Sequence, residues 1–116
     1  MVDWKPSASL KNLQQRAYAL AKIRRFFSER DVLEVETPLL ARSTVPDVYI
    51  ESIAAEVVEG NSIRKNFLQT SPEFFMKRLL ASGSGSIYQI AKAFRQEEKG
   101  ARHNIEFTLL EWYRLS

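Results

Sequence analysis

Two β-rich runs joined by a charged loop constrain the fold of this chain more than any other feature of its sequence. Bulky side chains alternate with small or polar ones in Ile87–Arg95, and a second β-rich run extends over Ile105–Tyr113, with Phe107, Glu111 and Tyr113 on one face. This period of two is typical of strands with two different faces. Residues 96–104 between them are rich in charged side chains. The pattern predicts two strands joined by a charged loop.

The N-terminal part predicts a helix followed by a strand. Apolar residues recur at helical spacing from Asn12 to about Glu29, and we expect Asn12 to cap this amphipathic helix. The short run Val32–Glu36 is rich in β-branched residues, which favours a strand. Pro38 ends it, because proline cannot donate a hydrogen bond to a neighbouring strand.

The middle of the chain predicts a hairpin and a second helix. Val48–Val58 and Ile63–Leu68 are spaced for two strands that pair around a turn at 59–62. Serine as a cap, then proline and glutamate in the first turn, predicts a helix from Pro72 to about Ala81. The Ser-Gly run 82–86 ends that helix. Helices and strands without regular alternation favour an α+β fold, with an antiparallel sheet flanked by helices.

Composition excludes several classes of protein. The 116 residues, 45% hydrophobic and 27% charged, fit one globular domain. No apolar run approaches the ~20 residues of a membrane helix, and the N-terminus lacks a signal-peptide profile, so we expect a soluble, cytoplasmic protein with no membrane partner. The absence of cysteine and the single His103 argue against disulfides, thiolate nucleophiles and a zinc site. The net charge of +3 is compatible with an anionic ligand such as a nucleotide.

Four groups of residues are candidates for chemistry, and each has a structural alternative. Arg95 at a strand end offers a bidentate fork for a phosphate, and Glu97 can accept from an amino group, although an ordinary surface ion pair has the same residues. Glu111 and Tyr113 share a strand face and suit an ammonium group, or simply form a half-exposed surface. Ser71-Pro72-Glu73 is a helix cap with or without a further role, and His103 fits a loop residue better than a general base.

The order of these segments resembles the catalytic domain of class II aminoacyl-tRNA synthetases, in the lysine, aspartate and asparagine subgroup. The first predicted helix and the strand before Pro38 look like motif 1 of that family, and the strand, loop and strand of 94–114 look like its motif 2. Within the subgroup, the chain most resembles the lysyl-tRNA synthetase paralogues that ligate (R)-β-lysine to elongation factor P. The predicted helix begins too early to leave room for an N-terminal anticodon-binding barrel, which supports that choice.

The resemblance implies roles for the candidate residues. Arg95 would hold the α-phosphate of ATP and Glu97 the amino edge of adenine, with Gln96 between them in place of a more usual asparagine. Asn104 would lie against the nucleotide, and Phe107 would stack on the adenine ring. The amino-acid substrate would contact the remaining residues, which are Ser71, Pro72, Glu73, Glu111 and Tyr113.

The resemblance also implies a reaction and its participants. A substrate carboxylate would attack the α-phosphate of ATP, in the presence of Mg²⁺, to give an acyl-adenylate and pyrophosphate. Elongation factor P would be the acceptor and the motif 1 helix would form a homodimer. The alternatives are a lysyl-tRNA synthetase fragment acting on tRNA-Lys and a non-catalytic nucleotide-binding module. The sequence stops soon after motif 2, so we expect residues 1–116 to be the N-terminal part of the catalytic domain, without motif 3, and to have little or no adenylation activity alone.

Overall fold

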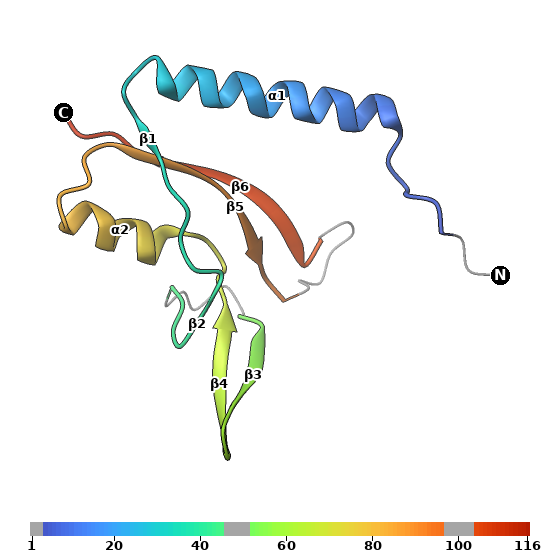
Figure 1. Ribbon diagram of the computed structural model, residues 1–116, viewed down its shortest axis with the longest axis vertical. Helices are drawn as coiled ribbons and strands as arrows, with labels where there is room; N and C mark the ends of the chain where they lie inside the picture. The colour runs from blue at the N-terminus through green and yellow to red at the C-terminus, as the bar shows by residue number, and fades with distance from the viewer. Residues whose placement is uncertain (1–3, 46–51, 97–103) are drawn as a thin grey trace.

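The chain folds into two helices and two small sheets (Figure 1). The computed structural model describes residues 4–45, 52–96 and 104–116. In these ranges the elements are α1 (Leu10–Ser28), β1 (Leu33–Glu34), β2 (Leu40–Ala41), β3 (Ala54–Glu59), β4 (Ser62–Leu68), α2 (Glu73–Ala81), β5 (Ile87–Phe94) and β6 (Glu106–Tyr113). The predicted α+β class is confirmed.

The main sheet has the order β1-β5-β6. Strands β5 and β6 are antiparallel, from Ile87 opposite Tyr113 to Phe94 opposite Glu106, which confirms the predicted strand pair. Strand β1 differs from the expected antiparallel arrangement, because it runs parallel to β5 with Leu33 opposite Ile87. A parallel pair needs a long connection, and here the chain between β1 and β5 contains the whole small sheet and α2.

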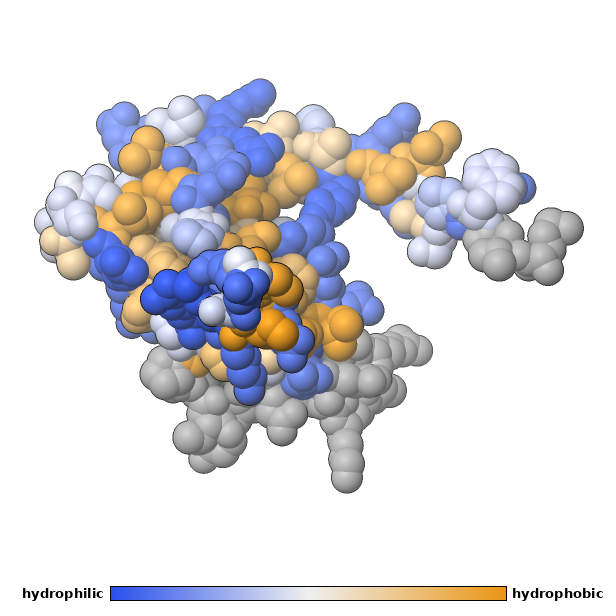
Figure 2. All heavy atoms as spheres, turned by 60° about the horizontal axis from the view of Figure 1, so that its bottom comes forward, coloured by the Kyte–Doolittle hydropathy of each residue, from blue (hydrophilic) through white to orange (hydrophobic). Residues whose placement is uncertain are grey.

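The small sheet has the order β2-β4-β3 and is antiparallel throughout. The predicted turn is confirmed, because Glu59 pairs with Ser62 and Gly60 has a φ of 57°. The predicted strand 48–58 is described only from residue 52, and β3 occupies its second half. In Figure 2 the end of this hairpin points toward the viewer, and apolar and charged residues lie side by side on it.

Both helices begin differently from the prediction. Helix α1 starts at Leu10, because the Ser9 hydroxyl accepts a hydrogen bond from the Asn12 N–H (3.1 Å); Ser9, not Asn12, is the cap. Helix α2 starts at Glu73 with Pro72 at the cap position. The Ser71 hydroxyl still accepts from the Glu73 N–H at 3.3 Å. The predicted serine therefore bonds to the first turn of α2, although it lies one residue before the cap position.

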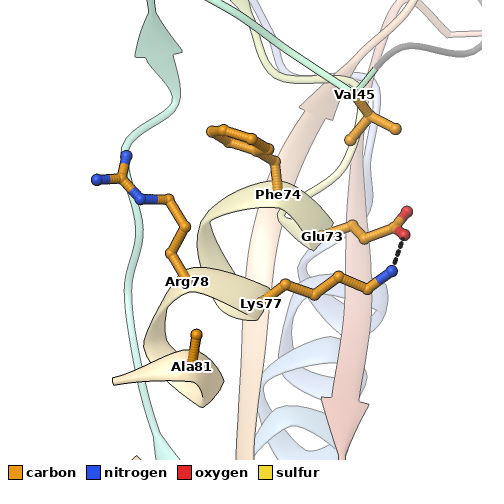
Figure 3. A pocket seen from close by; sticks show the side chains of 6 residues that line it. All are labelled: Val45, Glu73, Phe74, Lys77, Arg78 and Ala81. Carbon is orange, nitrogen blue, oxygen red and sulfur yellow. Dashed lines mark hydrogen bonds and ion pairs between the residues drawn. The ribbon is translucent and has the colours of Figure 1, made fainter. Parts of the chain in front are cut away.

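Helix α1 covers one side of the main sheet and α2 lies on the other (Figures 1 and 3). The ring of Phe27 stacks on that of Tyr88 with 4.3 Å between centroids, and Ile23, Ile90 and Leu110 pack around them. The apolar stripe predicted for α1 is therefore buried only near the C-terminal end of the helix, whereas Leu13 is exposed. Neither helix in the described ranges is long and apolar enough to cross a membrane.

Candidate functional site

Arg95 lies directly after β5 and is held at three points. Its backbone N–H donates to the Ile105 carbonyl (2.9 Å), and its side-chain Nε donates to the Thr70 carbonyl (3.2 Å). The guanidinium carbon lies 5.1 Å from the centre of the Phe107 ring, within the range of a cation–π contact. No carboxylate of the described ranges forms an ion pair with Arg95. The structure thus brings Arg95 and Phe107 together.

Phe107 is half-buried on β6, on the sheet face turned away from α1. Its partner on β5 is Ala93, a small and fully buried residue. Gln96 and Asn104 are exposed at the two ends of the connecting loop. Glu97 and His103 lie outside the described residues. The nucleotide half of the predicted site is therefore seen in Arg95, Phe107 and the loop ends.

The other end of the same face has a carboxylate and a phenol in contact. The Tyr113 hydroxyl donates to Oε2 of Glu111 at 2.9 Å. Burial raises the pKa of the Tyr113 phenol, and the hydrogen bond to Glu111 and the negative charges of Glu111 and Glu73 raise it further. Tyr113 therefore remains a neutral hydrogen-bond donor across the physiological range. Within 4–45, 52–96 and 104–116, no donor bonds to the second carboxylate oxygen of Glu111.

Glu73 reaches this region from the start of α2. Its carboxylate accepts from Nζ of Lys77 at 2.6 Å, one helical turn on (Figure 3). The pair borders an open hollow of about 350 Å³, whose lining residues are Val45, Glu73, Phe74, Lys77, Arg78 and Ala81. Pro72 is buried and Ser71 half-buried at the turn into the helix. The structure places Glu73 within electrostatic reach of Tyr113, although the two belong to different elements.

The two halves of the site are separated along β6. Phe107 and Glu111 are four positions apart, which is roughly 13 Å in a strand, and Tyr113 lies about 7 Å further along. Arg95 lies opposite Ile105, on the side of Phe107 away from Glu111, so the order along this face is Arg95, Phe107, Glu111 and Tyr113. The alternation of β6 places Phe107, Glu111 and Tyr113 on one face, as the sequence predicts.

Sequence reasoning missed the role of Gln69 and Thr70. Both are fully buried, and the backbone carbonyl of Thr70 accepts the Arg95 hydrogen bond. Every residue has a backbone carbonyl, so the sequence does not show which carbonyl accepts this hydrogen bond. Two polar residues before a helix start also carry no signal in the sequence, because a connection of this kind is usually polar and exposed.

The described residues offer no ready metal site. Within 4–45, 52–96 and 104–116, no three histidine, cysteine, aspartate or glutamate side chains come close enough together to hold an ion.

The sequence matches known proteins along nearly its whole length. Residues 1–115 match the family model of class II tRNA synthetases (D, K and N). The chain is 56% identical over 115 residues to an elongation factor P–(R)-beta-lysine ligase of Vibrio vulnificus, a match that covers 97% of this chain and 36% of the relative. Proteins of the same name from Haemophilus influenzae and Erwinia tasmaniensis are 54% and 53% identical, over 96% and 97% of this chain and 35% of each relative. The chain thus spans about a third of the length of these relatives.

Proposed function

Because the chain belongs to the class II tRNA synthetases of the D, K and N type, we propose that it forms part of an ATP-dependent ligase. In this proposal the ligase activates lysine or (R)-β-lysine and transfers it to elongation factor P. The relatives' name, elongation factor P–(R)-beta-lysine ligase, supports (R)-β-lysine and elongation factor P. The observation that carries the proposal is the arrangement on one sheet face, where Arg95 and Phe107 occupy one end and Glu111 with Tyr113 the other. We place the reaction in the cytoplasm.

The nucleotide is assigned to the Arg95 end of the face. The Arg95 Nε is bonded to Thr70, and among the described residues its two terminal nitrogens have no hydrogen-bond acceptor, so they can bind phosphate oxygens in a fork. The Phe107 ring offers a flat apolar surface for adenine. Gln96, Glu97 and Asn104 complete this half in the proposal, with Glu97 accepting from the adenine amino group.

The amino acid is assigned to the acidic end. Glu111 and Glu73 supply negative charge, and the Tyr113 hydroxyl, bonded to Glu111, fixes the direction of that carboxylate. A substrate with two ammonium groups, as in lysine or β-lysine, suits two separated carboxylates. Ser71 and Pro72 shape the turn that presents Glu73.

The chemistry follows from holding the two substrates in line. The substrate carboxylate attacks the α-phosphorus of ATP, a new oxygen–phosphorus bond forms, and the bond to the bridging oxygen breaks to release pyrophosphate. Arg95 stabilises the charge that develops on the α-phosphate oxygens. A lysine amine of elongation factor P then attacks the acyl carbon, so that an amide forms and AMP leaves. Magnesium bound with ATP would offset phosphate charge, and no step assigned to the chain's residues depends on it.

A homodimer through α1 is part of the proposal. The N-terminal half of α1 exposes Leu10 and Leu13, of which Leu13 belongs to the predicted stripe, and Phe26 is half-exposed near the other end of the helix. Exposed apolar side chains that lie together are typical of a surface that is covered by a partner.

The proposal is tested with a chimera in which residues 1–115 replace the matching third of the Vibrio vulnificus relative. We expect amino-acid-dependent exchange of pyrophosphate into ATP, and transfer of labelled β-lysine to elongation factor P. Transfer to tRNA-Lys instead would identify a lysyl-tRNA synthetase, and nucleotide binding without exchange a non-catalytic module. Little or no exchange is expected from the 116 residues alone.

The variant Arg95→Ala in the chimera tests whether Arg95 binds ATP, independently of its contribution to the fold. Loss of charge-assisted hydrogen bonds to phosphate is worth about 1.5–3 kcal/mol, so we expect ATP to bind about 10- to 150-fold more weakly in a calorimetric titration. The matched control is Lys92→Ala, which removes a cation from the opposite face of the same strand. Equal losses in both variants would contradict the assignment of ATP to Arg95.

A further inference from the structure

The buried pair Gln69-Thr70 connects the small sheet with the end of β5. Both residues are 1% exposed. The Gln69 N–H donates to the Leu39 carbonyl (2.8 Å), and the Gln69 carbonyl accepts from the Phe94 N–H (2.9 Å). The backbone of one residue therefore joins the segment before β2 to the last residue of β5.

The side chain of Gln69 adds two further attachments. Its Nε2 donates to the carbonyls of Ser43 (2.8 Å) and Phe67 (3.3 Å). Its Oε1 is buried and has no hydrogen-bond partner among the described residues. An unpaired buried oxygen costs stability, and the two hydrogen bonds from Nε2 offset that cost. What the amide supplies is a fixed backbone position between Ser43 and the end of β4.

The next residue bonds directly to Arg95. The Thr70 carbonyl accepts from the Arg95 Nε, and Ser71, at the turn into α2, follows immediately. The same short stretch of backbone therefore orients the guanidinium and begins the acidic half of the site. Because a carbonyl bonded to Nε fixes the plane of the guanidinium, it also fixes where the terminal nitrogens point.

We infer that Gln69 is a positioning residue for Arg95. Its buried amide fixes the backbone at Thr70, and the Thr70 carbonyl holds the Arg95 guanidinium in the orientation that a phosphate requires. The identity of the anion rests on the proposed function, whereas the contact itself is measurable without any nucleotide. Gln69 touches no substrate in this arrangement, and it acts only through Thr70 and Arg95.

The test is hydrogen exchange at the Arg95 Nε–H, measured by NMR on the full chain and assigned by the signal lost in Arg95→Lys. In Gln69→Met the amide is replaced by an apolar side chain of similar length. A hydrogen bond worth about 1 kcal/mol corresponds to about a fivefold change, so we expect Nε–H exchange about fivefold faster than in the wild type.

Tyr88→Phe is the matched control. It removes the hydroxyl that donates to Glu34 at 2.9 Å, from a buried residue of β5 on the face toward α1. We expect this variant to lose stability and keep the wild-type exchange rate at Arg95. An unchanged rate in Gln69→Met, or equal acceleration in both variants, would overturn the inference.

A second variant, Gln69→Asn, and the KM values of the chimera distinguish a positioning role of Gln69 from a general loss of folding. If Gln69→Met does not fold, Gln69→Asn keeps the amide on a side chain one methylene shorter and is expected to accelerate exchange less. Failure of both variants to fold overturns the inference, since Gln69 would then support the fold as a whole. In the chimera, Gln69→Met should raise the KM for ATP about fivefold and leave the KM for the amino acid within twofold. Absence of any exchange activity in the unsubstituted chimera would count against the proposed function only.

Discussion

The two faces of the β5–β6 strand pair differ in what they contact: one packs against α1, and the other carries polar and charged side chains. Toward α1, the face is closed by aromatic packing, with Phe27 stacked on Tyr88 and 5.9 Å from the Trp112 ring. Toward α2, it carries Arg95, Glu111 and Tyr113 in half-buried positions. The same two strands thus provide a rigid support on one side and chemically versatile groups on the other.

Polar side chains on the two faces differ in their hydrogen-bond partners. On the closed face, the Tyr88 hydroxyl donates to Glu34, which is also bonded to Arg24, so the charges of Glu34 and Arg24 are paired within the fold. On the other face, the terminal nitrogens of Arg95 and one oxygen of Glu111 form no hydrogen bond within the part of the chain that the structure describes. The contrast supports our proposal that α1 stabilises the fold and that the opposite face binds substrates.

The largest expected effect is a loss of folding stability when the aromatic packing between α1 and the main sheet is removed. Phe27→Ala removes a buried ring from the contact between α1 and the main sheet, and a change of this kind costs about 3–5 kcal/mol. Urea unfolding monitored by circular dichroism measures the loss. The control is the neighbouring Phe26→Ala, at a residue 49% exposed, with an expected cost of at most about 1 kcal/mol. Similar losses at both positions would show that the two faces are not distinguished by packing at α1.

A smaller effect is expected from the acidic end of the open face. Glu111→Gln removes the negative charge and leaves the shape unchanged, so we expect the KM of the chimera for the amino acid to rise about tenfold with little change in stability. Pyrophosphate exchange at varied amino-acid concentration measures this rise. Glu106→Gln, at an exposed residue on the opposite face of the same strand, is the control. A matching rise in the control would refute the placement of the ammonium group at Glu111.

The smallest effect is in the dependence of stability on pH. The folded-state pKa of Tyr113 is raised above the value of about 10 in the unfolded chain. As pH rises, the unfolded chain therefore loses this proton first, and the stabilisation is complete below about pH 10 and decreases above it. Tyr113→Phe should lessen the fall in stability above pH 10, as measured by urea midpoints.

The closed face provides the comparison for this titration. Burial, the hydrogen bond to Glu34 and the charge of Glu34 raise the pKa of Tyr88, while Arg24 lowers it. Tyr88→Phe should therefore change the alkaline limb in the same direction and by less, because part of the shift is offset by Arg24. A steeper alkaline fall in either variant than in the wild type would reverse the sign assigned to its phenol.

The sequence by itself determined the parts of the molecule that depend on local periodicity. The alternation in 87–95 and 105–113 predicted the strand pair and the common face of Phe107, Glu111 and Tyr113, because side chains alternate in any extended strand. The turn at Gly60 and the helix start near Ser71 were predicted for the same reason, since glycine and a serine hydroxyl act on residues close to them in the chain.

Only the tertiary structure decided which distant segments meet. The parallel pairing of β1 with β5, the two-residue strand β2 and the burial of α1 at Phe27 depend on residues more than twenty-five positions apart. The support of Arg95 by the Thr70 carbonyl is of the same kind, because a backbone acceptor has no residue type and its partner is 25 positions away. Local preferences are worth tenths of a kcal/mol per residue, whereas burial of a large side chain is worth about 1.5–3 kcal/mol, so packing chooses among the arrangements that the local pattern allows.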